Sequence, residues 1–158
     1  MTGRWLVHGG SGTRCPRPSG WTTVEIADAA AAREPARTGA FRASLVLTVL
    51  DNGGETFGRW QAGADRALPV ALADYELVDL RRCTVAGRPG GQRVARHRAR
   101  DGTMLMLHQW FCALDGAGTT LSATCDVRMY REMSEHAYAA AAGLLLPARG
   151  VPSASFVR

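Results

Sequence analysis

The sequence predicts one α+β domain in which an antiparallel β-sheet of about six strands is sandwiched between helices. Residues 92–127 divide into three strand-like runs at two turn signals, Arg100–Thr103 and Asp115–Gly118, which is typical of an antiparallel meander. The middle run is apolar at successive positions, so both faces of the sheet need a covering layer. Residues 55–72 and 129–146 repeat apolar side chains at helical spacing and can supply the two layers.

The first part of the chain predicts a loop-rich start followed by two strands. His8–Gly12 matches no phosphate-binding or nucleophile motif, so we expect a flexible turn. Trp21–Ala27 alternates and contains β-branched residues, and Phe41–Leu50 is almost continuously apolar, so both predict strands. The segment between them, Asp28–Ala40, is rich in alanine and contains Pro35, which stops helices, so we expect a loop there.

Two helices and one further strand complete the predicted elements. Glu55–Leu72 predicts an amphipathic helix with Thr56 as a suitable N-cap, and Pro69 should kink the helix or end it. Tyr75–Ala86 carries spaced apolar residues and predicts the strand that precedes the meander. Met129–Leu146 predicts the second helix, whose apolar stripe consists mainly of alanine.

Turn chemistry predicts how the strands of the meander pair. The Asp-Gly dipeptide of the first turn favours a two-residue loop, so Arg100 should face Thr103. A four-residue second loop should make Leu114 face Thr119. Because side chains alternate between the faces of a sheet, this register gathers the soft and aromatic residues on one side. That face holds Met106, His108, Trp110, Cys112 and Cys125.

This face allows three interpretations. Plain packing is the first, because Cys and His at half-buried strand positions commonly serve only as core residues. The second is a cavity for a hydrophobic ligand, lined by the same five residues beneath the alanine-rich helix. The third is a metal or catalytic site, because His108 should face Cys125 with His97 diagonal to them. A slip of one residue at either turn would dissolve that cluster, so we expect no metal and no catalytic residue here.

Arginine supplies all of the positive charge apart from histidine. The chain has 19 Lys+Arg, none of them Lys, against 14 Asp+Glu, and its formal net charge is +5. Arg93, Arg96 and Arg98 on the first meander strand, together with Trp60, are our candidates for contacting a protein partner. A solvated edge that resists aggregation is the structural alternative. No aromatic pattern of an RNA-binding domain accompanies the arginines, so we expect no nucleic-acid partner.

Length and motif content set the remaining expectations. The 158 residues fit one domain over residues 1–146, with a flexible Pro-, Gly- and Ser-containing tail over residues 147–158. The four cysteines form no CxxC pair, and no catalytic or cofactor-binding signature is present. No apolar run is long enough for a signal peptide or a membrane span. We therefore expect a cytoplasmic, non-enzymatic protein without a cofactor, whose oligomeric state is open.

Several short segments occur in an order found in a known superfamily. They are Pro18-Ser19-Gly20-Trp21 before a strand, the strand Phe41–Leu50, the helix opening Glu55-Thr56-Phe57, the segment Thr84–Val94, the turn Asp101-Gly102, Gln109-Trp110-Phe111, and Leu121–Thr124. This pattern, which extends over about residues 14–146, resembles the PsbP-like superfamily, in particular the bacterial LpqN- and DcrB-like proteins.

The resemblance implies an antiparallel sheet of about six strands between helices, with no catalytic machinery. Members of the superfamily are accessory or binding proteins, including cell-envelope lipoproteins, photosystem subunits, a nuclear-import factor and chaperone-like adaptors. The sequence departs from the lipoprotein members because Cys15 follows Gly12-Thr13-Arg14 rather than an apolar run. We therefore expect an adaptor- or chaperone-like protein-binding module, with a hydrophobic small-ligand carrier as the alternative.

Overall fold

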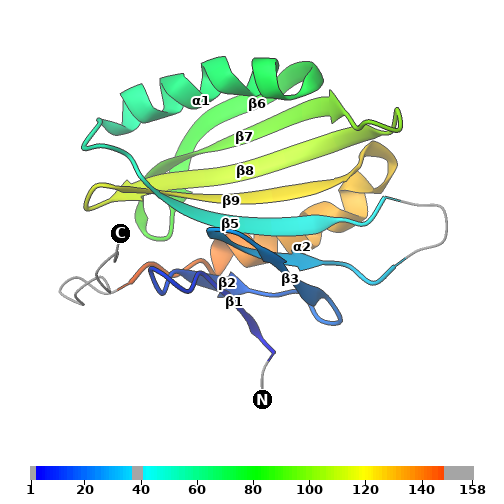
Figure 1. Cartoon of the computed structure of the whole chain (residues 1–158), viewed down its shortest axis with the longest axis horizontal. Helices are drawn as coiled ribbons and strands as arrows, with labels where there is room; N and C mark the ends of the chain where they lie inside the picture. Colours follow the sequence, from blue (N-terminus) through cyan, green and yellow to red (C-terminus); the bar gives the residue numbers. More distant parts are fainter. Residues whose placement is uncertain (1–2, 37–40, 148–158) are drawn as a thin grey trace.

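The computed structural model describes residues 3–36 and 41–147. In chain order the elements are β1 (Trp5–Val7), β2 (Arg14–Pro16), β3 (Thr22–Ile26), β4 (Ala29–Arg33), β5 (Ser44–Asp51), α1 (Phe57–Ala71), β6 (Ala73–Val85), β7 (Arg88–Arg98), β8 (Met104–Leu114), β9 (Ala117–Asp126), the 3-10 helix η1 (Val127–Met129) and α2 (Tyr130–Ala142). Seven strands form one antiparallel sheet in the order β3-β4-β5-β9-β8-β7-β6, and β1 pairs with β2 separately. Helix α1 covers one face of the large sheet and α2 the other (Figure 1), so the predicted α+β sandwich is confirmed.

The sheet has one strand more than expected because the alanine-rich segment is not a loop. Ala29–Arg33 forms β4 between β3 and β5, and its three central alanines are buried. Alanine has a low intrinsic preference for strands, but small side chains fit between two neighbouring strands, and this tertiary setting outweighs the preference. The prediction of a loop over Asp28–Ala40 was therefore wrong for Ala29–Arg33, while the predicted strands on either side are present as β3 and β5.

Helix α1 starts and ends close to the predicted positions. The Thr56 side chain caps it by accepting a hydrogen bond from the Arg59 backbone N–H at 3.3 Å, as expected. Pro69 lies in the last turn, and the helix ends two residues later at Ala71, because proline cannot donate the hydrogen bond that would continue it. Gln61 is the one buried residue of the helix, so α1 rests on the sheet through a narrow contact.

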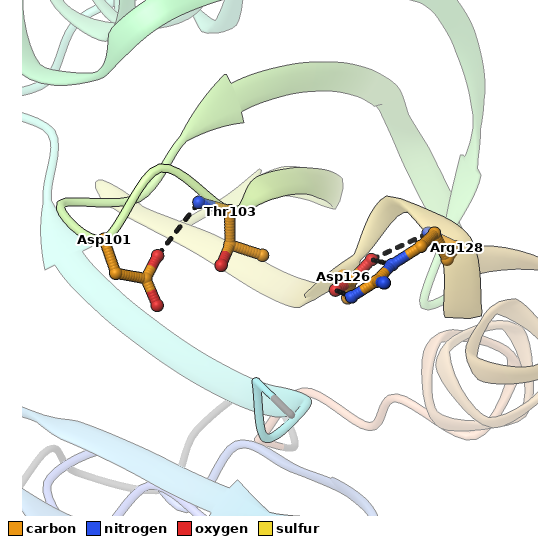
Figure 2. Close-up of polar contacts among 4 residues, drawn as sticks. All are labelled: Asp101, Thr103, Asp126 and Arg128. Atoms are coloured by element: carbon orange, nitrogen blue, oxygen red, sulfur yellow. Dashed lines mark hydrogen bonds and ion pairs between the residues drawn. The ribbon is translucent and has the colours of Figure 1, made fainter. Parts of the chain in front are cut away.

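The first meander turn is longer than predicted, and this changes the face of every β7 side chain. Arg98 pairs with Met104, so the strands are joined through Ala99–Thr103, where the Asp101 carboxylate accepts a hydrogen bond from the Thr103 backbone N–H (Figure 2). The pairing is shifted by one residue from the predicted register, and a shift of one exchanges the two faces. Arg93 and His97 therefore point towards α1, although alternation in the predicted register placed His97 beneath α2.

The second meander turn is shorter than predicted, but the faces are preserved. Leu114 pairs with Ala117 across the two-residue loop Asp115-Gly116, in which both residues have positive φ, as a type I′ hairpin requires. This register differs from the predicted one by two residues, so the same side chains stay on the same side. His108 faces Ala123 rather than Cys125.

The C-terminal helix packs as predicted but is shorter. The Asp126 carboxylate caps η1 by accepting hydrogen bonds from the Arg128 backbone and guanidinium (Figure 2), and α2 follows directly. Met133, Ala137 and Ala140 are buried against the sheet, and the helix ends at Ala142 rather than 146. Most of the predicted tail, residues 148–158, lies outside the described residues. In the described part of the chain, no helix is both long enough and apolar enough to cross a membrane.

Candidate binding surface

The sheet face beneath α2 is closed by aromatic side chains around His108. His108 is 1% exposed, its Nδ1 lies 3.1 Å from the Tyr130 hydroxyl, and its ring stacks on Trp110 with centroids 3.8 Å apart. Tyr138 of α2 meets both rings edge-on. Burial lowers the pKa of His108 to about 4, so the imidazole is neutral at neutral pH. This geometry is that of a packed core histidine.

The ligand cavity expected beneath α2 is filled in this structure. The space that remains there is about 10 Å³, which is roughly the room that one water molecule needs. Met106, Trp110, Cys112 and Cys125 share the face with His108 as predicted, but all four are buried side chains of the core. Burial raises the pKa of the Cys112 thiol to about 11 and that of Cys125 to about 12, so both remain protonated thiols.

The predicted cluster of two histidines and a cysteine does not assemble. His97 lies on the opposite face of the sheet from His108, because the register of β7 is shifted by one residue. No group of three metal-ligating side chains comes together within residues 3–36 and 41–147. The four cysteines are free thiols. Cys112 pairs with Thr119 across the β8–β9 ladder, whereas Cys125 pairs with Met106.

The face beneath α1 is organised by a buried arginine. Arg93 is 1% exposed, although the sequence placed it on a partner-binding surface. Its guanidinium donates to Gln109 Oε1 at 2.9 Å and to Gln61 Oε1 at 3.4 Å, forms an ion pair with Asp65 of α1, and lies 5.0 Å from the centroid of the Phe111 ring. Arg93 therefore tethers α1 to the sheet and is not available on the surface.

The other three predicted contact residues also have structural partners. Arg98 donates to the Asp74 carboxylate at 2.7 Å, and Arg96 forms an ion pair with Glu76, so both connect β7 to β6 while remaining partly exposed. Trp60 packs its indole ring directly over Gly118 of β9, where any side chain on the glycine would collide with the ring. These residues attach neighbouring elements to one another, and their geometry does not mark a shared binding site.

A groove of about 830 Å³ opens between α1 and the β6–β7 end of the sheet. Phe57 and Phe111 stack in its wall with ring centroids 5.9 Å apart, and Leu80 at the outer side is 44% exposed. Gly91 forms part of the floor, where a Cβ atom would lie 2.4 Å from the Phe111 ring. The groove thus combines an aromatic wall with a floor that only glycine permits.

The charges of the groove differ from one side to the other. Asp65, on the α1 side, is occupied by Arg93. On the β6 side, Arg81 pairs with Asp79 at 2.9 Å, whereas Arg82 is exposed and forms no ion pair with a described residue. The open side of the groove therefore offers exposed leucine and arginine side chains along β6, which suits a ligand with apolar and acidic groups.

The sequence alone did not single out the groove residues. Leu80 is one of the spaced apolar residues from which the strand was predicted, yet it is exposed because β6 is the last strand of the sheet. The available signal was the Gly90-Gly91 pair, which lies in a strand and marks a close approach of another group. The groove is therefore the candidate binding surface of the described residues, with Phe57, Leu80, Arg82 and Phe111 as its principal side chains.

Comparisons with known proteins identify the fold. No protein-family profile and no curated protein sequence matches the chain. Among solved structures, LpqN of Mycobacterium tuberculosis, described as involved in cell envelope biogenesis, is 17% identical with a TM-score of 0.67 and 90% coverage of each chain. Cyanobacterial PsbP from Synechocystis sp. PCC 6803 is 11% identical with a TM-score of 0.66, covering 90% of this chain and 91% of its own.

A third solved structure comes from yeast. The Ran-binding protein Mog1p of Saccharomyces cerevisiae is 10% identical with a TM-score of 0.57, covering 93% of this chain and 86% of its own. The chain therefore has the PsbP-like, LpqN-like fold, which confirms the resemblance found in the sequence. At these identities the similarity shows the fold alone.

Proposed function

We propose that the chain is a non-enzymatic, adaptor- or chaperone-like protein-binding module that acts in the cytoplasm through the groove between α1 and β6. The observation that carries the proposal is the contrast between the two faces. The space beneath the middle of α2 is about 10 Å³, and the larger opening on that side, about 740 Å³, lies only at the C-terminal end of the helix, whereas about 830 Å³ is accessible alongside α1 itself. The accessible space has exposed apolar and arginine side chains at its margin, which is the composition of a protein-contact surface.

The filled space beneath α2 bears on the alternative of a hydrophobic small-ligand carrier. A carrier needs a concave site of roughly 300–1,000 Å³ that encloses most of its ligand. The five residues first considered for that role instead pack against one another and against Tyr130, Tyr138 and Met133. The groove beneath α1 has the volume, but its open, partly charged margin suits a polypeptide better than an enclosed apolar molecule.

Affinity purification of the tagged chain from its native host tests the proposal. We expect one or a few proteins to co-purify at constant ratio with the wild type and to be lost with Leu80→Asp, which places a charge at the groove margin. Leu50→Asp is the matched control, because Leu50 is 53% exposed at the end of β5 and lies away from the groove residues. Equal loss with both variants, or substrate turnover by the purified chain, would contradict the proposal.

A further inference from the structure

The open edge of the sheet lies beside the groove. Strand β6 is the last strand of the sheet, pairs only with β7 among the described strands, and is 13 residues long. An edge strand presents unpaired backbone N–H and C=O groups, and these can pair with another extended chain. The groove and this edge share Leu80, Arg82 and Thr84.

The two halves of β6 differ in regularity. Register shifts occur between Ala73 and Glu76 and between Leu77 and Asp79, and the ion pairs to Arg96 and Arg98 lie in this half. Such bulges and charges are devices that protect an edge from pairing. From Leu80 to Val85 every residue pairs with β7 without interruption, so this half presents a regular edge.

The hairpin geometry shows which backbone groups point outward. Val85 pairs with Arg88 across the two-residue loop Ala86-Gly87, whose residues both have positive φ, and the residues that flank such a loop form a hydrogen-bonded pair. Hydrogen-bonded and non-hydrogen-bonded pairs alternate along the ladder. Thr84 therefore belongs to a non-hydrogen-bonded pair, and its partner Pro89, which has no N–H, agrees with this assignment.

By the same alternation, Leu80, Arg82 and Thr84 direct their N–H and C=O groups away from β7. Their side chains all lie on the α1 side of the sheet, along the groove. One short stretch of chain thus offers three outward-facing peptide groups together with an apolar, a cationic and a hydroxyl side chain. The neighbouring Arg81, on the other face, is paired with Asp79, so Arg82 is the unpaired positive charge of this stretch among the described residues.

We propose that Leu80–Thr84 of β6 accepts an extended, acidic segment of a partner protein, which adds to the sheet as a further strand beside β6. The proposal rests on the proposed function and specifies its partner. On the groove side, the added strand would place an apolar residue beside Leu80, Asp or Glu beside Arg82, and a β-branched residue beside Thr84. Charge complementarity selects the acidic segment, because Arg82 has no ion-pair partner among the described residues.

A second copy of this chain is a poorer occupant of the same edge. Two copies that pair antiparallel about their centre at Arg82 would place two arginines directly opposite each other, and a centre at Arg81 would do the same. Like charges at directly opposed positions destabilise a strand pair. The opposite edge of the sheet, β3, is only five residues long and carries the acidic Glu25 as its fourth residue, which disfavours an acidic chain.

The test uses nine-residue random peptides displayed on phage and selected on the complete wild-type chain. We expect enrichment of alternating sequences with Asp or Glu flanked two residues away by apolar or β-branched residues. A synthetic peptide of the selected sequence should lose about tenfold or more in affinity for Arg82→Pro, which removes an outward N–H without removing a bond to β7. Arg82→Ala, which keeps the N–H, should lose less, and Glu25→Pro at the other edge should bind as the wild type does.

N-methylation of the synthetic peptide, one residue at a time, gives a readout that needs no protein variant. Methylation at alternate residues should abolish binding, because those N–H groups bond to β6, while methylation at the others should leave affinity within about twofold. Uniform tolerance, binding that survives Arg82→Pro, or failure to enrich any peptide would overturn the proposal. A wild-type dimer in sedimentation that Arg82→Pro dissociates would instead assign the edge to a second copy and would also overturn it.

The outcomes separate this inference from the proposed function. A host partner that co-purifies equally with the wild type and Arg82→Pro but is lost with Leu80→Asp supports binding at the groove by another mode. In that case the proposal of an added strand beside β6 is wrong, and the proposal of a protein-binding module is retained. A host partner that co-purifies equally with the wild type, Arg82→Pro and Leu80→Asp would contradict both the added strand and the binding module at the groove.

Discussion

The two faces of the large sheet are built in opposite ways. Beneath α2, the helix buries Met133, Ala137 and Ala140, and the remaining space is about 10 Å³. Beneath α1, the helix buries Gln61, the main tether is the Arg93 network, and a groove of about 830 Å³ stays open. Helix α2 is therefore part of the core, whereas α1 is joined to the sheet by the Arg93 network and by the aromatic contacts of Phe57 and Trp60. The α1 face therefore leaves accessible space alongside its helix, whereas the α2 face leaves it only at the C-terminal end of its helix.

The largest difference in stability between the two faces should appear when one aromatic side chain is removed from each. Trp110 is 4% exposed in the α2 face, so Trp110→Ala should lower the free energy of unfolding by about 3–5 kcal/mol. Phe57 is half-buried at the start of α1, so Phe57→Ala should cost only about 1–2 kcal/mol. Urea denaturation of both variants measures the difference. Equal costs would show that α1 is packed into the core as α2 is.

The pH dependence of stability should come mainly from the α2 face. Burial lowers the pKa of His108 to about 4 from its ordinary value near 6.5, so the unfolded chain binds a proton that the folded chain does not. Stability should therefore fall as the pH decreases from about 6.5 to about 4, by on the order of 3 kcal/mol. Denaturation at a series of pH values should show this loss in the wild type and its absence in His108→Gln.

His97 provides the matched control on the α1 face. Burial lowers the pKa of His97 as well, but this side chain is half-buried rather than fully buried. His97→Gln should therefore retain most of the decline in stability between pH 6.5 and pH 4. A wild-type decline that persists in His108→Gln and disappears in His97→Gln would contradict the assignment.

The sequence predicted the α2 face well because that face depends on alternation alone. The apolar residues of β8 and β9 share a side in any register that is shifted by an even number, so an error of two residues left Met106 and Cys125 together. The helix that covers them was recognised by its period, and two of its three buried residues are alanines, in agreement with the predicted alanine-rich stripe.

The α1 face could not be predicted in the same way because it depends on one turn. The Asp101-Gly102 dipeptide favours a two-residue loop, but the Asp101 side chain caps a longer turn, and the odd shift moved Arg93 from the α2 side of the sheet to the α1 side, where it is buried. A buried arginine needs partners from distant elements, here Asp65 and Gln109, and no local pattern reveals such a meeting. Nor does a local pattern show that β6, rather than β7, ends the sheet.

The polar tether of α1 should be measurable by removing its acidic partner. Asp65→Ala leaves the buried Arg93 guanidinium with its two amide partners alone, so we expect a loss of about 1–3 kcal/mol in unfolding free energy. Glu76→Ala is the control, because its pair with Arg96 is largely exposed and should contribute less than about 1 kcal/mol. Denaturation by urea distinguishes them. A cost for Asp65→Ala as small as that of the control would mean that packing, not charge, holds α1.

The side chains that cap η1 and α1 should also differ in their contribution to stability, by a smaller amount. Asp126 is 4% exposed and receives both backbone and guanidinium hydrogen bonds from Arg128, whereas Thr56 accepts one bond at 3.3 Å at the exposed start of α1. Removing a cap costs about 0.5–2 kcal/mol, so Asp126→Ala should lie near the upper value and Thr56→Ala near the lower one.

The two caps should also differ in their response to acid. The hydrogen bonds from Arg128 lower the pKa of Asp126, so its contribution is fully present above the ordinary pKa of an aspartate, near 4. It is lost as the pH falls through the lowered pKa, because the folded chain must then take up the proton. The difference in stability between the wild type and Asp126→Ala should therefore shrink below about pH 4, whereas the difference for Thr56→Ala, which carries no titratable group, should not. A pH-independent difference at Asp126 would show that the cap acts through geometry alone, and the charge would then not distinguish the start of η1 from that of α1.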